Sequence, residues 1–142
     1  MACCLFVVVG LVGVAFADDQ AAEFKKLNGT WKMEQAEPNG SKWPDAMTQQ
    51  FTLVLKDEKY QLLSKSPADE GTVKLDASKK PKTMEIKGEQ GPNKGRTMLA
   101  IFEVDKDTLK VCYDLSGKAY PTEFTSPANS GRFLVTYKRS KE

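Results

Sequence analysis

The chain of 142 residues contains no histidine. Imidazole is the commonest general base, a usual zinc ligand and the proton carrier of serine and cysteine triads, so sites of these kinds are excluded. Any catalysis would therefore depend on carboxylates. The acidic pairs are Asp57-Glu58, Asp69-Glu70, and Asp105 with Asp107. Each pair lies in a short polar segment typical of a turn, so we expect no catalytic residue, no metal site, no cofactor and no enzymatic activity.

Two further motifs match ligand sites only in part. The turn Asp105-Lys106-Asp107 offers fewer oxygen ligands than calcium takes. The glycine-rich segment "GEQGPNKGR" (residues 88–96) lacks the G-x-x-x-x-G-K-[ST] order of a phosphate-binding loop, and no helical pattern follows it. We interpret this segment as a flexible hairpin loop.

The first 17 residues, "MACCLFVVVGLVGVAFA", have the pattern of an export signal. They carry no charge, contain an apolar core from Leu5 to Val14, and end in the small residues that a signal peptidase accepts. We predict that residues 1–17 are cleaved, and that residues 18–142 form one secreted or periplasmic domain without a stable membrane span. The leader lacks Lys and Arg, which leaves an uncleaved anchor or a misplaced start codon as alternatives.

Cysteine content and charge limit the function further. Cys3 and Cys4 leave with the leader, so the mature domain keeps Cys112 alone and has no internal disulfide. We interpret Cys112 as a small packing residue, with an exposed reactive thiol as the alternative. The net charge of +2 balances 21 basic against 19 acidic residues scattered along the chain. No dense basic face results, and we expect no binding of nucleic acid.

Apolar and polar residues alternate through most of the mature chain, which predicts strands rather than helices. Only the lead-in "DDQAAEFKKL" is compatible with one or two helical turns. Gly, Pro, Asn and Asp clusters separate the alternating segments. The eight predicted strands are Gly29–Glu37, Gln50–Lys56, Lys59–Lys65, Gly71–Leu75, Lys82–Lys87, Arg96–Val104, Thr108–Asp114 and Arg132–Arg139.

The alternation also predicts which side chains face the core. The inward set is Trp31, Met33, Phe51, Leu53, Leu55, Val73, Leu75, Met84, Ile86, Leu109, Val111, Tyr113, Phe133, Val135 and Tyr137. In the sixth segment both Met98-Ala100-Phe102-Val104 and Leu99-Ile101 are apolar. Either that strand is covered on both faces or its register differs from the prediction.

Short connections predict antiparallel neighbours, and eight such strands can close into an all-β, up-and-down barrel without a free edge. The connections then alternate between the two ends of the barrel. The longer ones, around residues 38–49, 66–70, 88–95 and 115–131, fall mostly at one end, which we call the mouth. The shorter turns, around residues 57–58, 76–81 and 105–107, fall at the other end, which we call the floor.

We predict that the motif "GTW", at the start of the first strand, lies at the floor. The eighth strand is antiparallel to the first, so its end brings Arg139 beside Trp31. We predict that Trp31 closes the floor with Arg139 over its ring, a cation-π contact worth about 0.5 to 2 kcal/mol. Gly29 would let the preceding chain cross closely underneath. The alternative is an ordinary core tryptophan and a frayed surface arginine.

Gly29-Thr30-Trp31, followed by seven more strands and a terminal arginine, resembles the lipocalin superfamily. That resemblance implies a barrel able to hold a small apolar ligand. The lipocalin pattern has Thr-Asp-Tyr between its sixth and seventh strands, whereas this chain has Asp105-Lys106-Asp107.

Five motifs together resemble an uncharacterised exported domain family found mainly in planctomycetes and related bacteria. They are "GTWK" (29–32), "GPNKG" (91–95), "DTLKVCY" (107–113), "PTEF" (121–124) and Lys138-Arg139. The resemblance covers nearly the whole mature chain. It implies an exported lipocalin-like domain from a bacterium and brings no assigned activity.

The mouth is the remaining candidate site. We predict an apolar rim bordered by positive charge, with ligand-binding residues at the rim and in the interior. The rim set is Trp43, Pro44, Tyr120, Pro121 and Phe124, with Lys42, Lys94, Arg96 and Lys118 nearby, and the interior set is Phe51, Tyr113 and Tyr137. The pattern favours a small apolar or amphipathic, anionic ligand.

Two alternatives to a ligand container stay open. Bulky residues such as Trp31, Phe51, Phe133 and Tyr137 are large enough to fill the interior completely. The loop aromatics also suit a protein-binding or inhibitor module that grips an exported partner protein.

Overall fold

The computed structural model describes residues 15–65 and 68–140. Most of the predicted leader, including Cys3 and Cys4, lies outside the described residues. The first described element is the helix α1 (Ala15–Leu27). Neither of the two described helices is long and apolar enough to cross a membrane.

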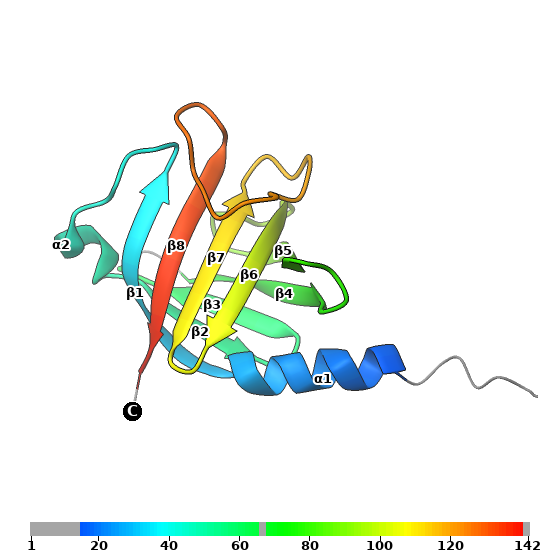
Figure 1. The fold of residues 1–142 in the computed structure, drawn as a ribbon. Coiled ribbons are helices and arrows are strands. Elements are labelled where there is room, and N and C mark those ends of the chain that lie inside the picture. The colour runs from blue at the N-terminus through cyan, green and yellow to red at the C-terminus, as the bar shows by residue number, and fades with distance from the viewer. Residues whose placement is uncertain (1–14, 66–67, 141–142) are drawn as a thin grey trace, which may run out of the picture.

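Eight antiparallel strands follow α1 and close into an up-and-down barrel, which confirms the predicted fold class (Figure 1). Each strand pairs with its neighbours in sequence, and β8 pairs back with β1. A short helix, α2 (Asp45–Thr48), interrupts the first long loop. The strands are β1 (Gly29–Pro38), β2 (Thr52–Lys56), β3 (Lys59–Leu63), β4 (Asp69–Asp76), β5 (Lys82–Gln90), β6 (Thr97–Asp105), β7 (Thr108–Asp114) and β8 (Arg132–Arg139).

The predicted strand bounds agree with the structure to within a few residues, and two helical features differ. The helix α1 spans 13 residues instead of one or two turns, and it begins at Ala15, within the predicted leader. Phe24 and Leu27 bury their side chains against the barrel core. The helix α2 was not predicted, since four residues are too few to show a helical period.

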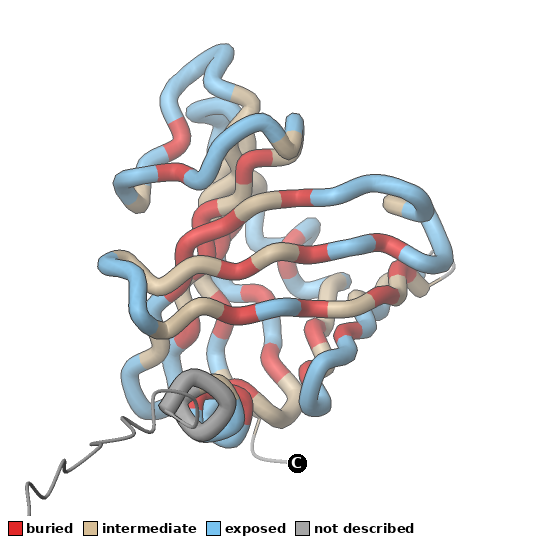
Figure 2. The backbone as a smooth tube through the Cα atoms, turned by 90° about the vertical axis from the view of Figure 1, so that its right-hand side faces the viewer, coloured by how far each residue is buried: buried red, intermediate tan, exposed pale blue. Residues whose placement is uncertain are grey.

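Buried and exposed positions alternate along the strands, as Figure 2 shows. The inward parity holds in the six strands for which the sequence predicted one, with Val73, Met84, Val111 and Val135 among the residues nearly inaccessible to solvent. Outward residues such as Lys32 are exposed. The core therefore lies along the barrel axis.

The strand β6 is covered on both faces. Met98, Ala100 and Phe102 are buried inside, and Ile101, which has the opposite parity, is also buried. The cover over the outer wall is the segment 115–131, which leaves the mouth and folds back across β7 (Figure 1). The Cys112 thiol beneath it hydrogen-bonds the carbonyl oxygen of Thr125 at 3.3 Å. Cys112 is fully buried, which confirms its interpretation as a packing residue.

The floor joins three segments that are distant in sequence. The strand register pairs Trp31 with Arg139, and the guanidinium carbon of Arg139 lies 4.2 Å from the centre of the Trp31 ring, as predicted. Arg139 also donates hydrogen bonds to the carbonyl oxygens of Lys26 at 2.6 Å and Asn28 at 2.9 Å. The Trp31 indole N–H donates to the carbonyl oxygen of Leu27 at 2.8 Å. These contacts fasten the end of α1 to the barrel.

The structural role of Gly29 at the floor differs from the predicted one. Its φ of +138° lies in a region that favours glycine, and a Cβ there would come within 3.0 Å of the Arg139 Nη1 atom. Glycine is therefore favoured mainly by its backbone conformation, and its lack of a side chain also leaves room for the end of Arg139. The prediction had assigned this close approach to the preceding chain.

Candidate ligand-binding cavity

Above the floor, the side chains leave a cavity of about 100 Å³ inside the barrel. Its wall is mainly apolar and draws on β1 to β8 and the mouth loops. The lining residues are Met33, Leu53, Leu55, Tyr60, Leu62, Asp69, Val73, Met84, Ile86, Asn93, Met98, Leu109, Val111, Tyr113, Leu115, Phe133 and Tyr137. The bulky residues therefore fill much of the interior but not all of it.

The size of this cavity limits what it can hold. Pockets for drug-sized ligands typically measure about 300 to 1,000 Å³, whereas an engineered apolar cavity of about 150 Å³ holds benzene. Three of the five methionines in the chain, Met33, Met84 and Met98, line the wall. Methionine side chains are unbranched and repack easily, so this part of the wall is adaptable.

The hydroxyl groups of two tyrosines form a small polar patch in this apolar wall, which we call the first polar point. The hydroxyl groups of Tyr113 and Tyr137 lie 3.0 Å apart and share a hydrogen bond. Burial, together with the neighbouring Tyr137, raises the pKa of Tyr113 well above its ordinary value. Burial also raises the pKa of Tyr137 to about 12, while the hydrogen bond with Tyr113 opposes the rise. Both hydroxyls are therefore neutral at pH 7, and because one donates its proton to the other, the pair keeps one free O–H donor.

A second polar point surrounds Asp69, whose side chain is buried at the mouth end of β4. Its carboxylate accepts hydrogen bonds from the Asn93 side-chain amide at 2.7 Å and from the Asn93 backbone N–H at 3.2 Å. The Tyr60 hydroxyl donates to the same carboxylate over a longer distance of 3.4 Å. Burial, and then the negative charge of Asp69, raises the pKa of Tyr60. The loop 91–96 is thus tied to the cavity wall.

Two glycines allow these groups to approach. A Cβ on Gly71 would lie 2.9 Å from the Tyr60 ring and would collide with the backbone of Lys87. A Cβ on Gly88 would collide with the carbonyl group of Asn93. Only glycine fits at either position, because backbone atoms cannot move aside as the end of a flexible side chain can. The segment predicted to be a flexible hairpin loop is therefore folded tightly against β5.

An aromatic cluster covers another part of the mouth. Trp43 stacks on Phe51 with ring centres 5.7 Å apart and packs against Phe133 at 5.2 Å. Phe133 in turn lies 6.0 Å from Tyr113, which lines the cavity. Trp43 is held in place by a hydrogen bond from its backbone N–H to the carbonyl oxygen of Ala36 at 2.8 Å. Trp43 and Phe51 thus form an outer layer above the cavity.

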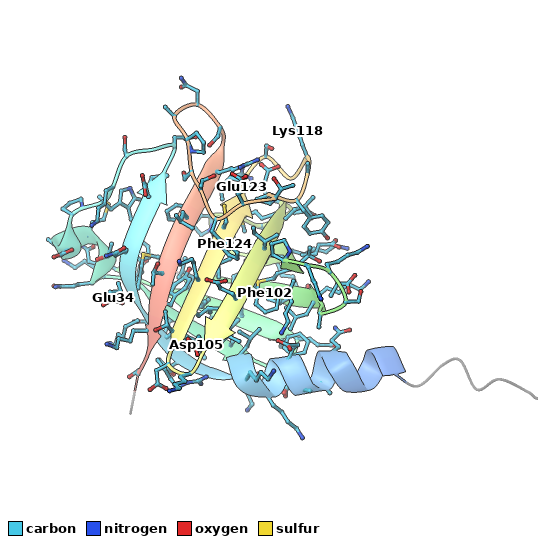
Figure 3. All side chains as sticks on the ribbon, viewed as in Figure 1. Glu34, Phe102, Asp105, Lys118, Glu123 and Phe124 are labelled. Carbon is cyan, nitrogen blue, oxygen red and sulfur yellow. The ribbon has the colours of Figure 1, made fainter. Side chains whose placement is uncertain are left out.

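The other predicted rim residues lie away from the interior. Tyr120 and Pro121 line a depression on the outer wall together with Ile101 and the turn between β4 and β5. Tyr120 is 41% exposed, while Pro121 is buried. Phe124 is half-buried in the segment that crosses the outside of β7 (Figure 3). The structure therefore brings Trp43, Phe51, Tyr113 and Tyr137 together but separates Tyr120 and Phe124 from them.

The predicted positive border is exposed to solvent. Lys42, Lys94, Arg96 and Lys118 all have exposed side chains, and Lys118 points away from the barrel in Figure 3. Arg96 also donates a hydrogen bond to the carbonyl oxygen of Leu115 at 3.2 Å. Charges so exposed are screened by water and salt, and they act only weakly on a molecule inside the barrel.

Sequence reasoning missed Asp69 and Asn93 as cavity residues. Asp69 was interpreted as part of a polar turn, and Asn93 as part of a flexible loop. The available signal was the three glycines in "GEQGPNKG", which indicate close backbone approach as readily as flexibility. Within the described residues, no group of three or more His, Cys, Asp or Glu side chains is arranged to hold a metal ion.

Comparison with solved structures gives a match to the fold. The crystal structure of a DUF4847 family protein from Bacteroides vulgatus ATCC 8482 is 16% identical in sequence to this chain, with a TM-score of 0.50. The match covers 85% of this chain and 99% of that one. No protein-family model matches the chain, and no curated protein matches it. The likeness is one of eight-stranded barrel architecture.

Proposed function

We propose that this protein is an exported binding protein whose barrel holds one small apolar or amphipathic molecule. The observation that carries the proposal is the interior cavity, with its apolar wall and two polar points. This combination is typical of small-molecule sites, where apolar surface supplies affinity and a few polar groups fix orientation. The lipocalin-like "GTW" motif and the contact of Arg139 with Trp31 support a place in that superfamily.

The role is one of binding rather than catalysis. The chain has no histidine, and the polar groups of the cavity are a carboxylate, an amide and three phenols. The carboxylate of Asp69 accepts two hydrogen bonds from Asn93, which fix its position in the wall. Such groups orient a guest better than they transform it.

Toluene binding tests for the internal site. Toluene is expected to bind to the wild type, and NMR or calorimetry measures this binding. Val73 lines the cavity, whereas Val54 pairs with outward-facing residues on the outer face of β2. Val73→Leu is expected to weaken toluene binding at least threefold because the added methylene group occupies cavity space. Val54→Leu is expected to leave it unchanged. Equal affinity in both variants would contradict an internal site.

Native mass spectrometry of the protein from its own host tests for the natural occupant. A co-purifying small molecule supports the container. A co-purifying exported protein would instead support the alternative, in which the mouth loops form a protein-binding or inhibitor surface. The same spectrum tests export, because cleavage after Ala17 leaves a mature chain that starts at Asp18. A full-length intracellular product would contradict the export proposal.

A further inference from the structure

We infer that the cavity selects a small primary amine with an apolar body, with Asp69 as the counter-ion of its ammonium group. This inference rests on the proposed function, since it names the class of molecule that the cavity would hold. It differs from the anionic ligand that the lysines and arginine around the mouth favour.

Asp69 has no positively charged partner among the described residues. Glu23, another buried carboxylate, pairs with Lys82 at 2.6 Å and Lys26 at 3.4 Å. Asp114 lies outside the cavity wall and accepts hydrogen bonds from the backbone N–H groups of Ser116 and Ala119. No lysine or arginine in residues 15–65 and 68–140 forms an ion pair with Asp69. A buried carboxylate is costly unless it is paired and hydrogen-bonded.

The carboxylate of Asp69 can accept more hydrogen bonds than its neighbours donate to it. An ionised carboxylate has about four acceptor positions. Asn93 occupies two of them, and the Tyr60 hydroxyl approaches only to 3.4 Å. An ammonium group donates up to three hydrogen bonds from a single compact centre, so it can use the open position and compete with the Tyr60 and Asn93 donors. A carboxylate guest has no donor to offer and would be repelled.

Asp69 lies at the mouth end of β4 and borders the apolar wall of the cavity. Asp69 and Asn93 line the same cavity as the three methionines, so an apolar body and its amine can be held together. Asn93 lies between Gly91 and Gly95, whose φ angles are +89° and +80°. Glycine adopts these backbone conformations most readily, and the turn that they form presents the Asn93 side chain to Asp69.

Three probes of matched shape test this inference at pH 7. They are benzylamine, toluene and benzoate, which are cationic, neutral and anionic. Calorimetry is expected to give at least tenfold tighter binding of benzylamine than of toluene, and no measurable binding of benzoate. Asp69→Asn is expected to remove the preference for benzylamine and leave toluene binding unchanged. Glu70→Gln, which alters the neighbouring outward-facing carboxylate, is the matched control and is expected to keep the preference.

A second variant provides an independent test in case Asp69→Asn does not fold. Asn93→Ala removes the shortest competing hydrogen bond to Asp69 and is expected to tighten benzylamine binding at least threefold. Unchanged or weaker benzylamine binding in that variant would overturn the inference. Binding of toluene without any preference for benzylamine would overturn it too, while leaving the proposed function intact. Failure of all three probes to bind the wild type would overturn both.

Discussion

The two ends of the barrel are closed in different ways. The floor is closed by Trp31, which has no exposed surface, and by an arginine that contacts its ring and two backbone carbonyl groups. The mouth is closed by stacked, half-buried aromatic rings and by the Asn93 loop, whose side chain bonds a carboxylate on β4. The contacts of Arg139 at the floor join a chain end to the barrel, whereas the contact of Asn93 at the mouth joins a loop to the barrel wall.

This difference indicates which end of the barrel is rigid and which end can open. The floor buries a large ring and satisfies its N–H group, so opening that end would expose apolar surface and leave polar groups unpaired. The mouth depends on a few hydrogen bonds and on partly exposed rings, which cost less to break. Entry of a molecule into the cavity is therefore expected at the mouth.

The largest difference between the two ends is expected from their tryptophans. Trp31→Ala should lower the free energy of unfolding by about 3–5 kcal/mol, because a fully buried ring leaves a cavity. Trp43→Ala should cost less than half of this amount, since Trp43 is only half-buried and loses mainly ring contacts. Urea unfolding followed by circular dichroism measures both. Similar losses would contradict the proposed difference between floor and mouth.

A smaller effect is expected from the arginines at the two ends of β8. Arg139→Ala removes the contact with Trp31 and two hydrogen bonds to carbonyl groups, and should cost about 2–3 kcal/mol of unfolding free energy. Arg132→Ala, at the mouth end of the strand, should change it by less than about 0.5 kcal/mol. Chemical denaturation compares the two variants, and equal small losses would reject a stabilising role for Arg139.

The smallest of the three effects concerns Asp114, where β7 meets the segment 115–131. Burial tends to raise the pKa of this carboxyl, but hydrogen bonds from Ser116 and Ala119 lower it overall. Because the folded pKa lies below the unfolded value of about 3.9, the stabilisation is present above that pH and disappears as the pH falls through the folded pKa. Asp114→Asn should therefore cost about 1 kcal/mol at pH 7 and progressively less below pH 4.

Unfolding midpoints from pH 2 to pH 7 check this last expectation. The matched control is Asp105→Asn, which changes an exposed carboxylate at the floor. A difference between wild type and Asp114→Asn that persists at the lowest pH would show that the charge of Asp114 is not the cause.

Several features of the fold were predictable because they depend on local alternation. The parity of Trp31 and Met33 against Lys32 gave the inward face of β1, and the ambiguous pattern around Ile101 reflects a strand that is covered on both faces. The approach of Arg139 to Trp31 was also predictable, since antiparallel closure places the end of the last strand beside the start of the first. These inferences require only the period of a strand and the order of the strands.

The candidate site was predictable only in part. Tyr113 and Tyr137 were expected inside and line the cavity, because their strand parity decides it. Tyr120 and Phe124 belong to a long loop without a period, so the sequence offered no basis for placing them on the outer wall. The bond between Asp69 and Asn93 joins two residues that are 24 positions apart, and neither strand parity nor composition predicts such a pair.

The sequence by itself determined eight strands, their inward faces and the closure of the barrel, since each of these follows from alternation and connection length. Only the tertiary structure decided that the interior keeps a cavity of about 100 Å³ with a buried carboxylate in its wall. The physical reason is that a cavity is what remains after side chains from all eight strands have packed against one another. Its volume and polarity therefore depend on distances across the barrel, which no local pattern contains.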